Sequence, residues 1–346
     1  MPPKRIAFVG TGANGAAIAA DLTRAGLDVT FIEQWPAHVE AMRANGIRVQ
    51  MPAETVVTPV TAIHLYEVAQ QRQLFDIVFV LVKAYDTRWA CELIKPLVAP
   101  DGLVVGLQNG MSLDDIADVM GPERTIGAVI EVAGNMYEPG IVNRQTPPSG
   151  SWFALGAYDY SARGREQEVA DVLGHAGTVQ VYEKVRAAKW GKLIVNAGEL
   201  VPSAILGMPL AAVVDVPRMH EFMLQVCREA ADVAVASGIE LVPIFGLQDL
   251  DLRDSHSYGN SLLNAVLERY SLPDTKTTVL QDWIKGRRSE VHEINGLVVE
   301  LGRRYGVDTT ANTVTVEVAR RIEAGELKEQ PENATLLTAV LAPTAA

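Results

Sequence analysis

The stretch Gly10-Thr11-Gly12-Ala13-Asn14-Gly15 decides the fold of this 346-residue chain. The apolar run Arg5-Ile6-Ala7-Phe8-Val9 precedes it and predicts a buried parallel strand, and residues 16–22 after it predict a helix with a small apolar face. The first glycine allows the tight turn, the second lets a pyrophosphate approach the backbone, and the third lets the helix pack close to the sheet. The helix N-terminus then offers free N–H groups to the phosphates. We therefore expect a dinucleotide to bind at Gly10, Thr11, Gly12, Ala13, Asn14 and Gly15.

The residues that follow strengthen this interpretation, because a glycine pattern alone is weak. After Gly26, a predicted helix end, residues 28–33 form a second predicted strand that ends in Glu33, eighteen residues beyond Gly15. An acid at this place typically accepts the ribose hydroxyls of the cofactor. Two other interpretations stay open: a glycine turn that binds no ligand, and for Glu33 an ordinary exposed acid at a strand end.

Composition sets the protein class. With 48% hydrophobic and 21% charged residues, the chain has an ordinary globular composition and is long enough for two domains. Its net charge of −12 argues against a nucleic-acid-binding surface. Cys91 and Cys227, both in apolar surroundings, are expected to be reduced thiols in the core of a cytoplasmic protein. No secretory or membrane-spanning segment is predicted.

Two predicted strands end in polar residues. Residues 76–82 form a continuous apolar run that is followed by Lys83, and residues 103–107 form another that leads to Asn109. Ligands of open α/β sheets bind outside the carboxyl ends of the strands, so we expect Lys83 and Asn109 to face the same crevice as the glycine turn. A solvated lysine and an Asn-Gly turn are the alternatives. Further strands are expected at 47–50, 56–60, 125–131, 141–144, 151–155 and 179–182, and helices at 87–97 and 162–173.

Helical periodicity replaces strands after residue 185. Phe222, Val226, Ala230 and Val233 lie on one face of a predicted long helix that ends at Gly238. Two more helices are expected from the apolar residues of 291–301 and of 314–322. The sequence thus predicts an α/β Rossmann domain over residues 1–185, an all-helical domain over 186–330 and a loosely held tail over 331–346.

The segment 247–271 is polar, and we expect a solvated loop there. Its Asp249, Asp251, Asp254 and His256 lack the spaced glycine and closing glutamate of a calcium loop, so no metal site is predicted.

A dinucleotide fold followed by a helical domain suggests hydride transfer, and reduction of a ketone needs an acid for the developing alkoxide. Lys192 is the candidate. It lies four residues before Asn196, so both project from one helical face. The alternative is a surface lysine whose stem covers apolar atoms.

The chain resembles the ketopantoate reductases, a branch of the 6-phosphogluconate-dehydrogenase-like superfamily, over about residues 4 to 325. The resemblance depends on motifs that occur in the same order: the glycine turn, Val82-Lys83-Ala84-Tyr85, Gln108-Asn109-Gly110-Met111, Lys192-Leu193-Ile194-Val195-Asn196, Leu280-Gln281-Asp282 and Ser289-Glu290-Val291-His292-Glu293-Ile294-Asn295-Gly296.

This resemblance implies roles for single residues. Lys192 would be the catalytic acid, and Glu290 would hold it and bind a substrate hydroxyl. Lys83 and Asn109 would approach the nicotinamide ribose and the substrate. The remaining substrate contacts would come from Asn196 and from Thr278, which replaces a serine that binds the substrate carboxylate. The resemblance also implies a small-molecule substrate and a homodimer formed through the helical domain.

Three departures from the family pattern bear on specificity. Leu200 and Leu210 stand where the family commonly has asparagines, which makes the site more apolar. The segment 247–271 looks longer than its counterpart in the family and could reshape the mouth of the site. Glu33-Gln34 stands where NADPH-using members tend to have a basic residue, and the nearest downstream arginine is Arg43. We therefore favour NAD(H), with NADP(H) as the alternative.

The expected function is an NAD(P)-dependent oxidoreductase that interconverts a 2-oxo and a 2-hydroxy compound, 2-dehydropantoate and pantoate or a related pair. A dehydrogenase of a bulkier, more apolar alcohol or 2-hydroxy acid is one alternative. A dinucleotide sensor without turnover is another, but such a sensor has no chemical need for Lys192 and Glu290.

Overall fold

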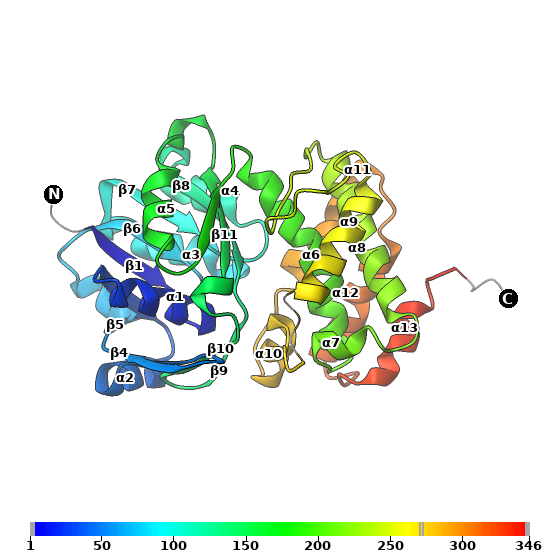
Figure 1. Cartoon of the computed structure of the whole chain (residues 1–346), viewed down its shortest axis with the longest axis horizontal. Coiled ribbons are helices and arrows are strands. Elements are labelled where there is room, and N and C mark those ends of the chain that lie inside the picture. Colours follow the sequence, from blue (N-terminus) through cyan, green and yellow to red (C-terminus); the bar gives the residue numbers. More distant parts are fainter. Residues whose placement is uncertain (1–3, 270, 272, 343–346) are drawn as a thin grey trace. The chain divides into compact units, whose positions relative to one another are not determined.

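The structure is a computed structural model that describes residues 4–269, 271 and 273–342. The chain divides into two compact units, the first ending at Arg186 and the second beginning at Ala187 (Figure 1). Each unit is described by itself below.

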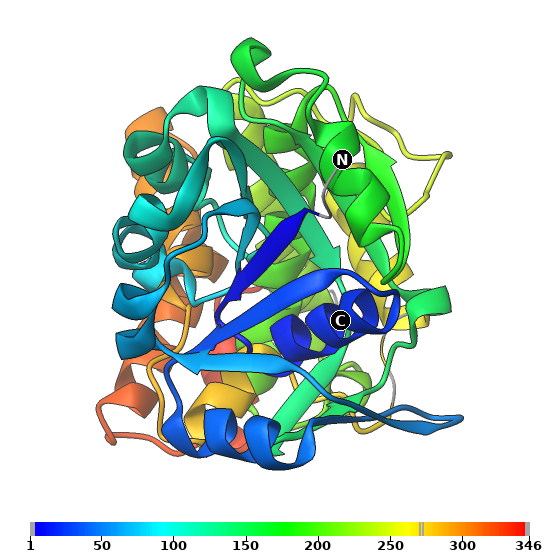
Figure 2. The ribbon, with the colours of Figure 1, turned by 90° about the vertical axis from the view of Figure 1, so that its left-hand side faces the viewer.

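The first unit is built on an eight-stranded sheet, whose twist fans the strands in Figure 2. The strand order is β12-β11-β8-β7-β6-β1-β2-β5. Neighbouring strands are parallel except β11, which runs antiparallel to β8. The strands are β1 (Arg5–Val9), β2 (Asp28–Glu33), β5 (Thr61–His64), β6 (Phe75–Val80), β7 (Val98–Gly106), β8 (Thr125–Glu131), β11 (Trp152–Ala157) and β12 (Thr178–Val181).

Helices cover both faces of this sheet, which gives the doubly wound α/β fold that the sequence predicts. Alternate residues of β1 enter different cores: Phe8 packs in the core that contains residues of α1 and α5, and Val9 in the core that contains residues of α3 and α4. These helices are α1 (Ala13–Arg24), α3 (Thr87–Ile94), α4 (Leu113–Met120) and α5 (Glu166–Leu173), and α2 (Pro36–Asn45) joins α1 on its face.

A second, four-stranded sheet has the order β4-β3-β10-β9. It consists of β3 (Ile47–Gln50), β4 (Thr55–Thr58), β9 (Gly134–Glu138) and β10 (Ile141–Arg144). Arg144 at the end of β10 is completely buried and pairs with Asp21 of α1. The strand predicted at 56–60 is present as β4 but ends at Thr58, and β5 begins beyond Pro59 and joins the large sheet.

The described residues of the second unit form helices and no strands, as the sequence predicts. The central helix is α8 (Met219–Ala236), which contacts α9, α11, α12 and α13. The four residues predicted to form its apolar face are all fully buried. The other elements are α6 (Val185–Ile205), α7 (Leu210–Val213), α9 (Ser255–Arg269), α10 (Thr278–Ile284), a π-helix (His292–Gly296), α11 (Leu297–Tyr305), α12 (Thr310–Glu323) and α13 (Ala334–Thr338).

Helix α6 passes close to α8 at a glycine. A Cβ built on Gly198 would collide with Cys227 Sγ and lie 3.0 Å from the carbonyl oxygen of Met223. The Cys227 thiol donates to the carbonyl oxygen of Ile194, 3.3 Å away. Cys227 and Cys91 are free, buried thiols as predicted, and burial raises the pKa of both.

Two expectations for the second unit are wrong. The predicted loop at 247–271 contains the helix α9, which buries Tyr258, Leu262 and Val266. The predicted loose tail is packed as far as α13, where Leu337 is fully buried and Asn333 donates to the carbonyl oxygen of Ile205 over 3.0 Å. Residues 343–346 of that tail lie outside the described residues.

The chain also shows shorter local differences from the expected elements. Helix α5 begins at Glu166 and not at residue 162, because Gly164 has a φ of +86° that a helix does not allow.

Across residues 4–269, 271 and 273–342, none of the helices combines the length and apolar character that crossing a bilayer requires.

Candidate active site

The loop between β1 and α1 has the geometry of a phosphate-binding turn. Gly10 has a φ of +92°, and a Cβ there would lie 2.7 Å from the backbone nitrogen of Val82. A Cβ on Gly15 would collide with the carbonyl oxygen of Gly10, so this glycine lets α1 pack against the turn. A Cβ on Gly12 would meet nothing within 4 Å. In the described part of the chain, no side chain caps the first turn of α1, so its N–H groups and the open face of Gly12 suit a pyrophosphate.

Glu33 fixes this loop from the end of β2. Its Oε2 accepts hydrogen bonds from the Thr11 backbone N–H, at 2.8 Å, and from the Thr11 hydroxyl, at 3.2 Å. Its Oε1 accepts from the backbone N–H groups of Gln34 and Trp35. Because Glu33 is only 6% exposed, the alternative of an ordinary exposed acid does not hold.

His38 of α2 holds the loop from another side. Its Nδ1 accepts a hydrogen bond from the backbone N–H of Gly140 at 2.8 Å, so Nε2 carries the proton and donates to the carbonyl oxygen of Thr11 at 3.0 Å. Burial lowers the pKa of His38, which favours this neutral form. No pattern in the sequence marks His38 as a site residue.

The carboxyl ends of β1, β6 and β7 lie next to one another, as expected. Val80 pairs with Val9 on one side and with Gly106 on the other. Lys83 and Asn109 each follow three residues beyond these paired positions, and both side chains are half-buried. The predicted neighbourhood of these strand ends and the glycine turn is therefore present within the first unit.

Gln108, the residue before Asn109, joins the ends of two strands. Its Nε2 donates to the carbonyl oxygen of Val82 at 2.6 Å and to the hydroxyl of Thr87 at 2.9 Å, and its Oε1 accepts from the Ser112 hydroxyl at 3.0 Å. These hydrogen bonds fix the backbone next to Lys83 and Asn109. In the sequence, Gln108 could be noticed as a glutamine that follows a buried apolar run.

In the second unit, a polar stripe runs along α6. The stripe consists of Lys189, Lys192, Asn196, Glu199 and Ser203, whose spacings of three, four, three and four place them on one helical face. All five are buried in a helix that is otherwise largely apolar. The predicted common face of Lys192 and Asn196 is therefore part of a longer polar line.

Lys192 and Glu199 form an ion pair within this stripe. Lys192 Nζ lies 3.5 Å from Glu199 Oε1, with the two side chains 11% and 6% exposed. The same Nζ lies 5.4 Å from the ring centroid of Phe245. The alternative of a surface lysine is therefore wrong for Lys192.

Two further segments attach to α6 beside the stripe. The Thr277 hydroxyl donates to the carbonyl oxygen of Leu200 at 2.9 Å and lies 3.3 Å from the Ser203 hydroxyl. This contact brings the first residue of α10, Thr278, to α6. The Thr278 Oγ1 is buried and has no hydrogen-bond partner among the described residues.

The second attachment is the π-helix, where Asn295 Nδ2 donates to the carbonyl oxygen of Ala197 at 3.1 Å. The backbone N–H of Gly296 bonds to the carbonyl oxygen of Val291 at 3.0 Å, five residues earlier, which is the π-type pattern. The buried Glu290 lies two residues before this π-helix. The segments that meet along α6 thus contain four predicted site residues: Lys192, Asn196, Thr278 and Glu290.

The two leucines expected to make the site more apolar, Leu200 and Leu210, are both buried.

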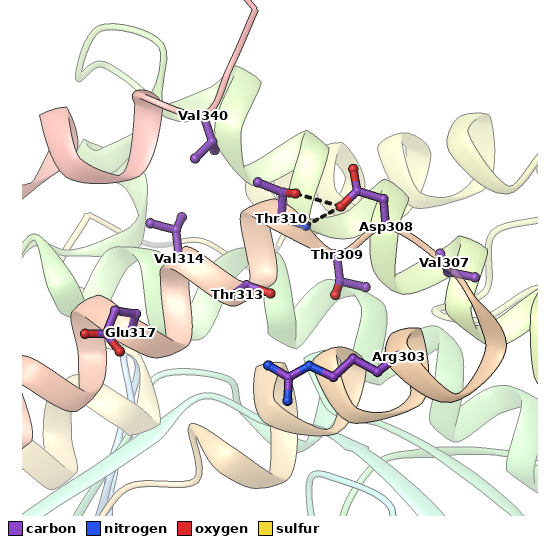
Figure 3. Close-up of a pocket in the computed structure, with 9 residues that line it drawn as sticks. All are labelled: Arg303, Val307, Asp308, Thr309, Thr310, Thr313, Val314, Glu317 and Val340. Carbon is purple, nitrogen blue, oxygen red and sulfur yellow. Dashed lines mark hydrogen bonds between the residues drawn. The ribbon is translucent and has the colours of Figure 1, made fainter.

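A pocket of about 480 Å³ in the second unit lies elsewhere, between α11 and α12 (Figure 3). Arg303 extends beneath Thr309 and Thr313 there, and Val340 lies on the other side. A second pocket, of about 420 Å³, includes Trp283 and Glu323. Neither pocket is lined by a predicted site residue. Within the described residues, no three His, Cys, Asp or Glu side chains are grouped so as to hold a metal ion.

Comparisons with known proteins agree on one family. The family model of ketopantoate reductase PanE/ApbA matches residues 6–158, and that of the ketopantoate reductase PanE/ApbA C terminal matches residues 184–323. The 2-dehydropantoate 2-reductase of Archaeoglobus fulgidus is 28% identical over 334 residues, which cover 94% of this chain and all of that protein. The enzyme of the same name from Mesorhizobium japonicum is 27% identical and covers 92% of this chain and 97% of its own.

Solved structures give the same result. A PanE/ApbA family ketopantoate reductase from Ralstonia eutropha is 27% identical, with a TM-score of 0.77 over 93% of this chain and 99% of its own. A D-mandelate dehydrogenase in a ternary structure with NADH and anilino(oxo)acetate, 22% identical, shares the fold with a TM-score of 0.81 over 93% of this chain and 98% of its own. The chain therefore belongs to the ketopantoate reductase family and is an oxidoreductase of that type, which acts on a CH–OH group.

Proposed function

We propose that this protein reduces a small 2-oxo acid with NADH and that it catalyses the reverse reaction on the corresponding 2-hydroxy acid. The first unit supplies the cofactor loop, and the second supplies the residues that transfer the proton and hold the substrate. The observation that carries the proposal is the buried Lys192 in the polar stripe of α6. Lysines are rarely buried, and those that are often belong to functional sites.

Lys192 is the proposed general acid. The nicotinamide, when bound, supplies the hydride that goes to the carbonyl carbon. The Lys192 ammonium gives a proton to the carbonyl oxygen as negative charge develops there, and in the oxidative direction the neutral amine takes that proton back. Glu290, placed at the π-turn beside α6, is proposed to orient the lysine and to bind a substrate hydroxyl.

Asn196 and Thr278 are the proposed contacts to the substrate in the second unit. The buried hydroxyl of Thr278, which lacks a partner among the described residues, supports this role because a buried polar atom without a hydrogen bond is costly. A substrate carboxylate would accept that hydrogen bond. Lys83 and Asn109 are proposed to serve the nicotinamide ribose and the substrate from the first unit.

NADH is the proposed cofactor and NADPH the alternative. The negative charge of Glu33 beside the loop disfavours a 2′-phosphate. Arg43, the nearest downstream arginine, is engaged by other groups: it pairs with Glu67 and Glu40, and its Nε donates to the carbonyl oxygen of Ala62 at 2.9 Å. Neutralising a 2′-phosphate would therefore cost these contacts.

The substrate has two candidates. The 2-dehydropantoate named for the relatives is the first. The buried Leu200 and Leu210 favour the second, a bulkier or more apolar 2-oxo acid with a branched or aromatic side chain, because both replace amides in the family pattern. The D-mandelate dehydrogenase shares the fold, and the argument for the second candidate depends on the leucines.

The experiment is an initial-rate assay at 340 nm with NADH and, separately, NADPH. The panel of 2-oxo acids includes ketopantoate, pyruvate, 2-oxoisovalerate and phenylpyruvate. Turnover of ketopantoate supports the first candidate, and turnover of branched or aromatic acids alone supports the second. If the protein binds NADH and turns over neither these acids nor the matching 2-hydroxy acids, NAD reduction with other hydroxylated compounds distinguishes an alcohol dehydrogenase from a sensor without turnover.

Lys192→Ala tests the proposed acid. We expect turnover to be abolished and NADH binding to remain nearly unchanged, since the residue belongs to the second unit. The exposed Lys328→Ala is the matched control and should retain the full rate. Turnover that survives Lys192→Ala would show that another group donates the proton.

We further infer a homodimer, to be measured by light scattering of the purified chain. A dimeric ketopantoate reductase from Staphylococcus aureus shares the fold with a TM-score of 0.68 at 19% identity. A monomeric mass at micromolar concentration would reject the homodimer.

A further inference from the structure

We propose that Glu199 is the positioning residue of Lys192: its carboxylate holds the lysine ammonium in place and in its charged form along α6. The inference rests on the proposed role of Lys192 as the acid. The family motifs quoted above do not include Glu199, and the carboxylate that they assign to the lysine is Glu290.

The geometry of the helix makes this pair specific. Residues 192 and 199 are seven apart, two turns of helix, so both lie on the face that carries Asn196 between them. The distance between Lys192 Nζ and Glu199 Oε1 is 3.5 Å. The lysine side chain therefore runs along the helix past Asn196 toward Glu199, whose neighbour Leu200 accepts a hydrogen bond from Thr277 at its carbonyl oxygen.

Burial strengthens the effect of the Glu199 carboxylate on the protonation of Lys192. An isolated buried ammonium tends to lose its proton, because a low dielectric disfavours the charge. An opposite charge within 4–6 Å counters that tendency, and more strongly when both groups are shielded from water. Since both side chains are nearly buried, Glu199 keeps Lys192 charged and able to donate a proton.

The residue next to Glu199 is apolar. Leu200 is buried, and its side chain is turned by about 100° from that of Glu199 on the helix. Of these two neighbouring residues, the polar one is therefore the one on the Lys192 face, and its carboxylate contacts the lysine.

The test is Glu199→Gln, which keeps the size of the side chain and removes its charge. In the reductive direction we expect the alkaline limb of the kcat profile to move about one pH unit lower, as the amine loses its proton more easily, so that kcat at a pH well above the limb falls about tenfold. The Kd for NADH should not change. Glu199→Asp, which keeps the charge on a shorter stem, should restore most of the position of that limb.

Glu229→Gln is the matched control. Glu229 is another buried glutamate of the second unit, but it accepts hydrogen bonds from the backbone N–H groups of Ala311 and Asn312 at the start of α12. Its replacement should lower the melting temperature and leave the pH profile unmoved. If Glu199→Gln is too unstable to assay, an alkaline limb in Glu199→Asp that is lower than in the wild type, by less than one unit, supports the proposal.

Three outcomes separate the possibilities. An unmoved alkaline limb in the Glu199 variants, with Lys192→Ala inactive, overturns the role of Glu199 and leaves the proposed acid intact. Equal effects of Glu199→Gln and Glu229→Gln on the profile also overturn it. Turnover that survives Lys192→Ala removes the proposed acid itself, and with it the basis of this inference.

Discussion

The Nε2 of His38 donates a hydrogen bond to the carbonyl oxygen of Thr11 over 3.0 Å, so a buried neutral imidazole supports the middle of the glycine loop. The other ring nitrogen accepts from Gly140, the residue that leads into β10. A protonated ring would present a second N–H to the Gly140 N–H, and this contact would be lost. The loop that is predicted to hold the pyrophosphate therefore depends on an imidazole that must stay neutral, and burial favours that form by lowering the pKa of His38.

The first prediction concerns acid stability. Burial lowers the folded-state pKa of His38 below the ordinary value of 6.5. Between the two pKa values the unfolded chain binds more protons, so stability falls as the pH drops below about 6.5, by at most about 1.4 kcal/mol per pH unit. His38→Gln should flatten this part of the curve of melting temperature against pH. The exposed His175→Gln is the control and should leave it as in the wild type; equal slopes for all three proteins would contradict the role of His38.

A second prediction separates two glycines of the same loop. Gly12→Ala should change the free energy of unfolding by less than about 0.5 kcal/mol, because φ is −63° and the added Cβ meets nothing within 4 Å. Its Kd for NADH should nevertheless rise about tenfold or more, a loss of about 1.4 kcal/mol, since the methyl group fills the face left for the pyrophosphate.

Gly10→Ala should behave in the opposite way. Its φ of +92° and its contact with Val82 make the substitution strained, and we expect a loss of stability of about 1–3 kcal/mol. Isothermal titration with NADH and chemical denaturation of both variants provide the comparison. If Gly12→Ala bound NADH as tightly as the wild type, the dinucleotide would not bind against this face.

A third prediction concerns the choice between NADH and NADPH. Glu33→Gln removes the negative charge beside the loop, so the ratio of kcat/KM for NADPH to that for NADH should rise by about tenfold, equivalent to about 1.4 kcal/mol. The glutamine has only one side-chain oxygen, so two of the four hydrogen bonds that the Glu33 carboxylate accepts are lost. The free energy of unfolding should therefore fall by about 1–3 kcal/mol. The exposed Glu54→Gln should change neither quantity, and an unchanged ratio in Glu33→Gln would remove the charge argument for NADH.

The fourth prediction addresses the substrate. If the proposed substrate site includes positions 200 and 210, replacing Leu200 and Leu210 together by Asn should raise kcat/KM for ketopantoate relative to phenylpyruvate, because an amide hydrogen-bonds a hydroxylated acid and a leucine does not. Each unsatisfied buried amide should cost about 1–3 kcal/mol of stability in the absence of substrate. The rates of the double variant and the wild type on both acids give the result. A relative preference that stays the same would show that these leucines do not set the substrate.

The sequence predicted the first unit better than the second, for physical reasons. Strands β8 and β10 were predicted with their observed bounds, because buried parallel and hairpin strands are bounded by clear changes in composition. The sequence predicts a loop where the helix α9 lies, because the exposed side of this helix carries Asn and Ser residues and acids precede it, which makes the whole segment polar. Its buried side is set by packing against α8, which sequence alone does not supply.

The site residues also divide into those that a local pattern predicts and those that depend on a partner elsewhere in the fold. Gly10, Gly12 and Gly15 were predictable because each has a backbone requirement that only glycine meets easily. Gln108, His38 and Glu199 were not, because each acts through a partner distant along the chain or two turns along a helix, and no motif marks such a pair. The contact of Glu199 with Lys192 requires that both side chains turn toward each other in a buried environment, which the spacing permits but does not demand.

The π-turn at His292–Gly296 has a consequence for how this site can change. A π-turn accommodates one residue more than an α-helical turn, so deleting a single residue within it would convert it to α-helical geometry. Because the wide turn itself takes up the extra residue, the chain on its two sides would keep nearly the same direction. The same deletion inside α11 would rotate one part of the helix by about 100° relative to the other. The chain beside Glu290 can thus change its length by one residue while the core face of α11 stays packed.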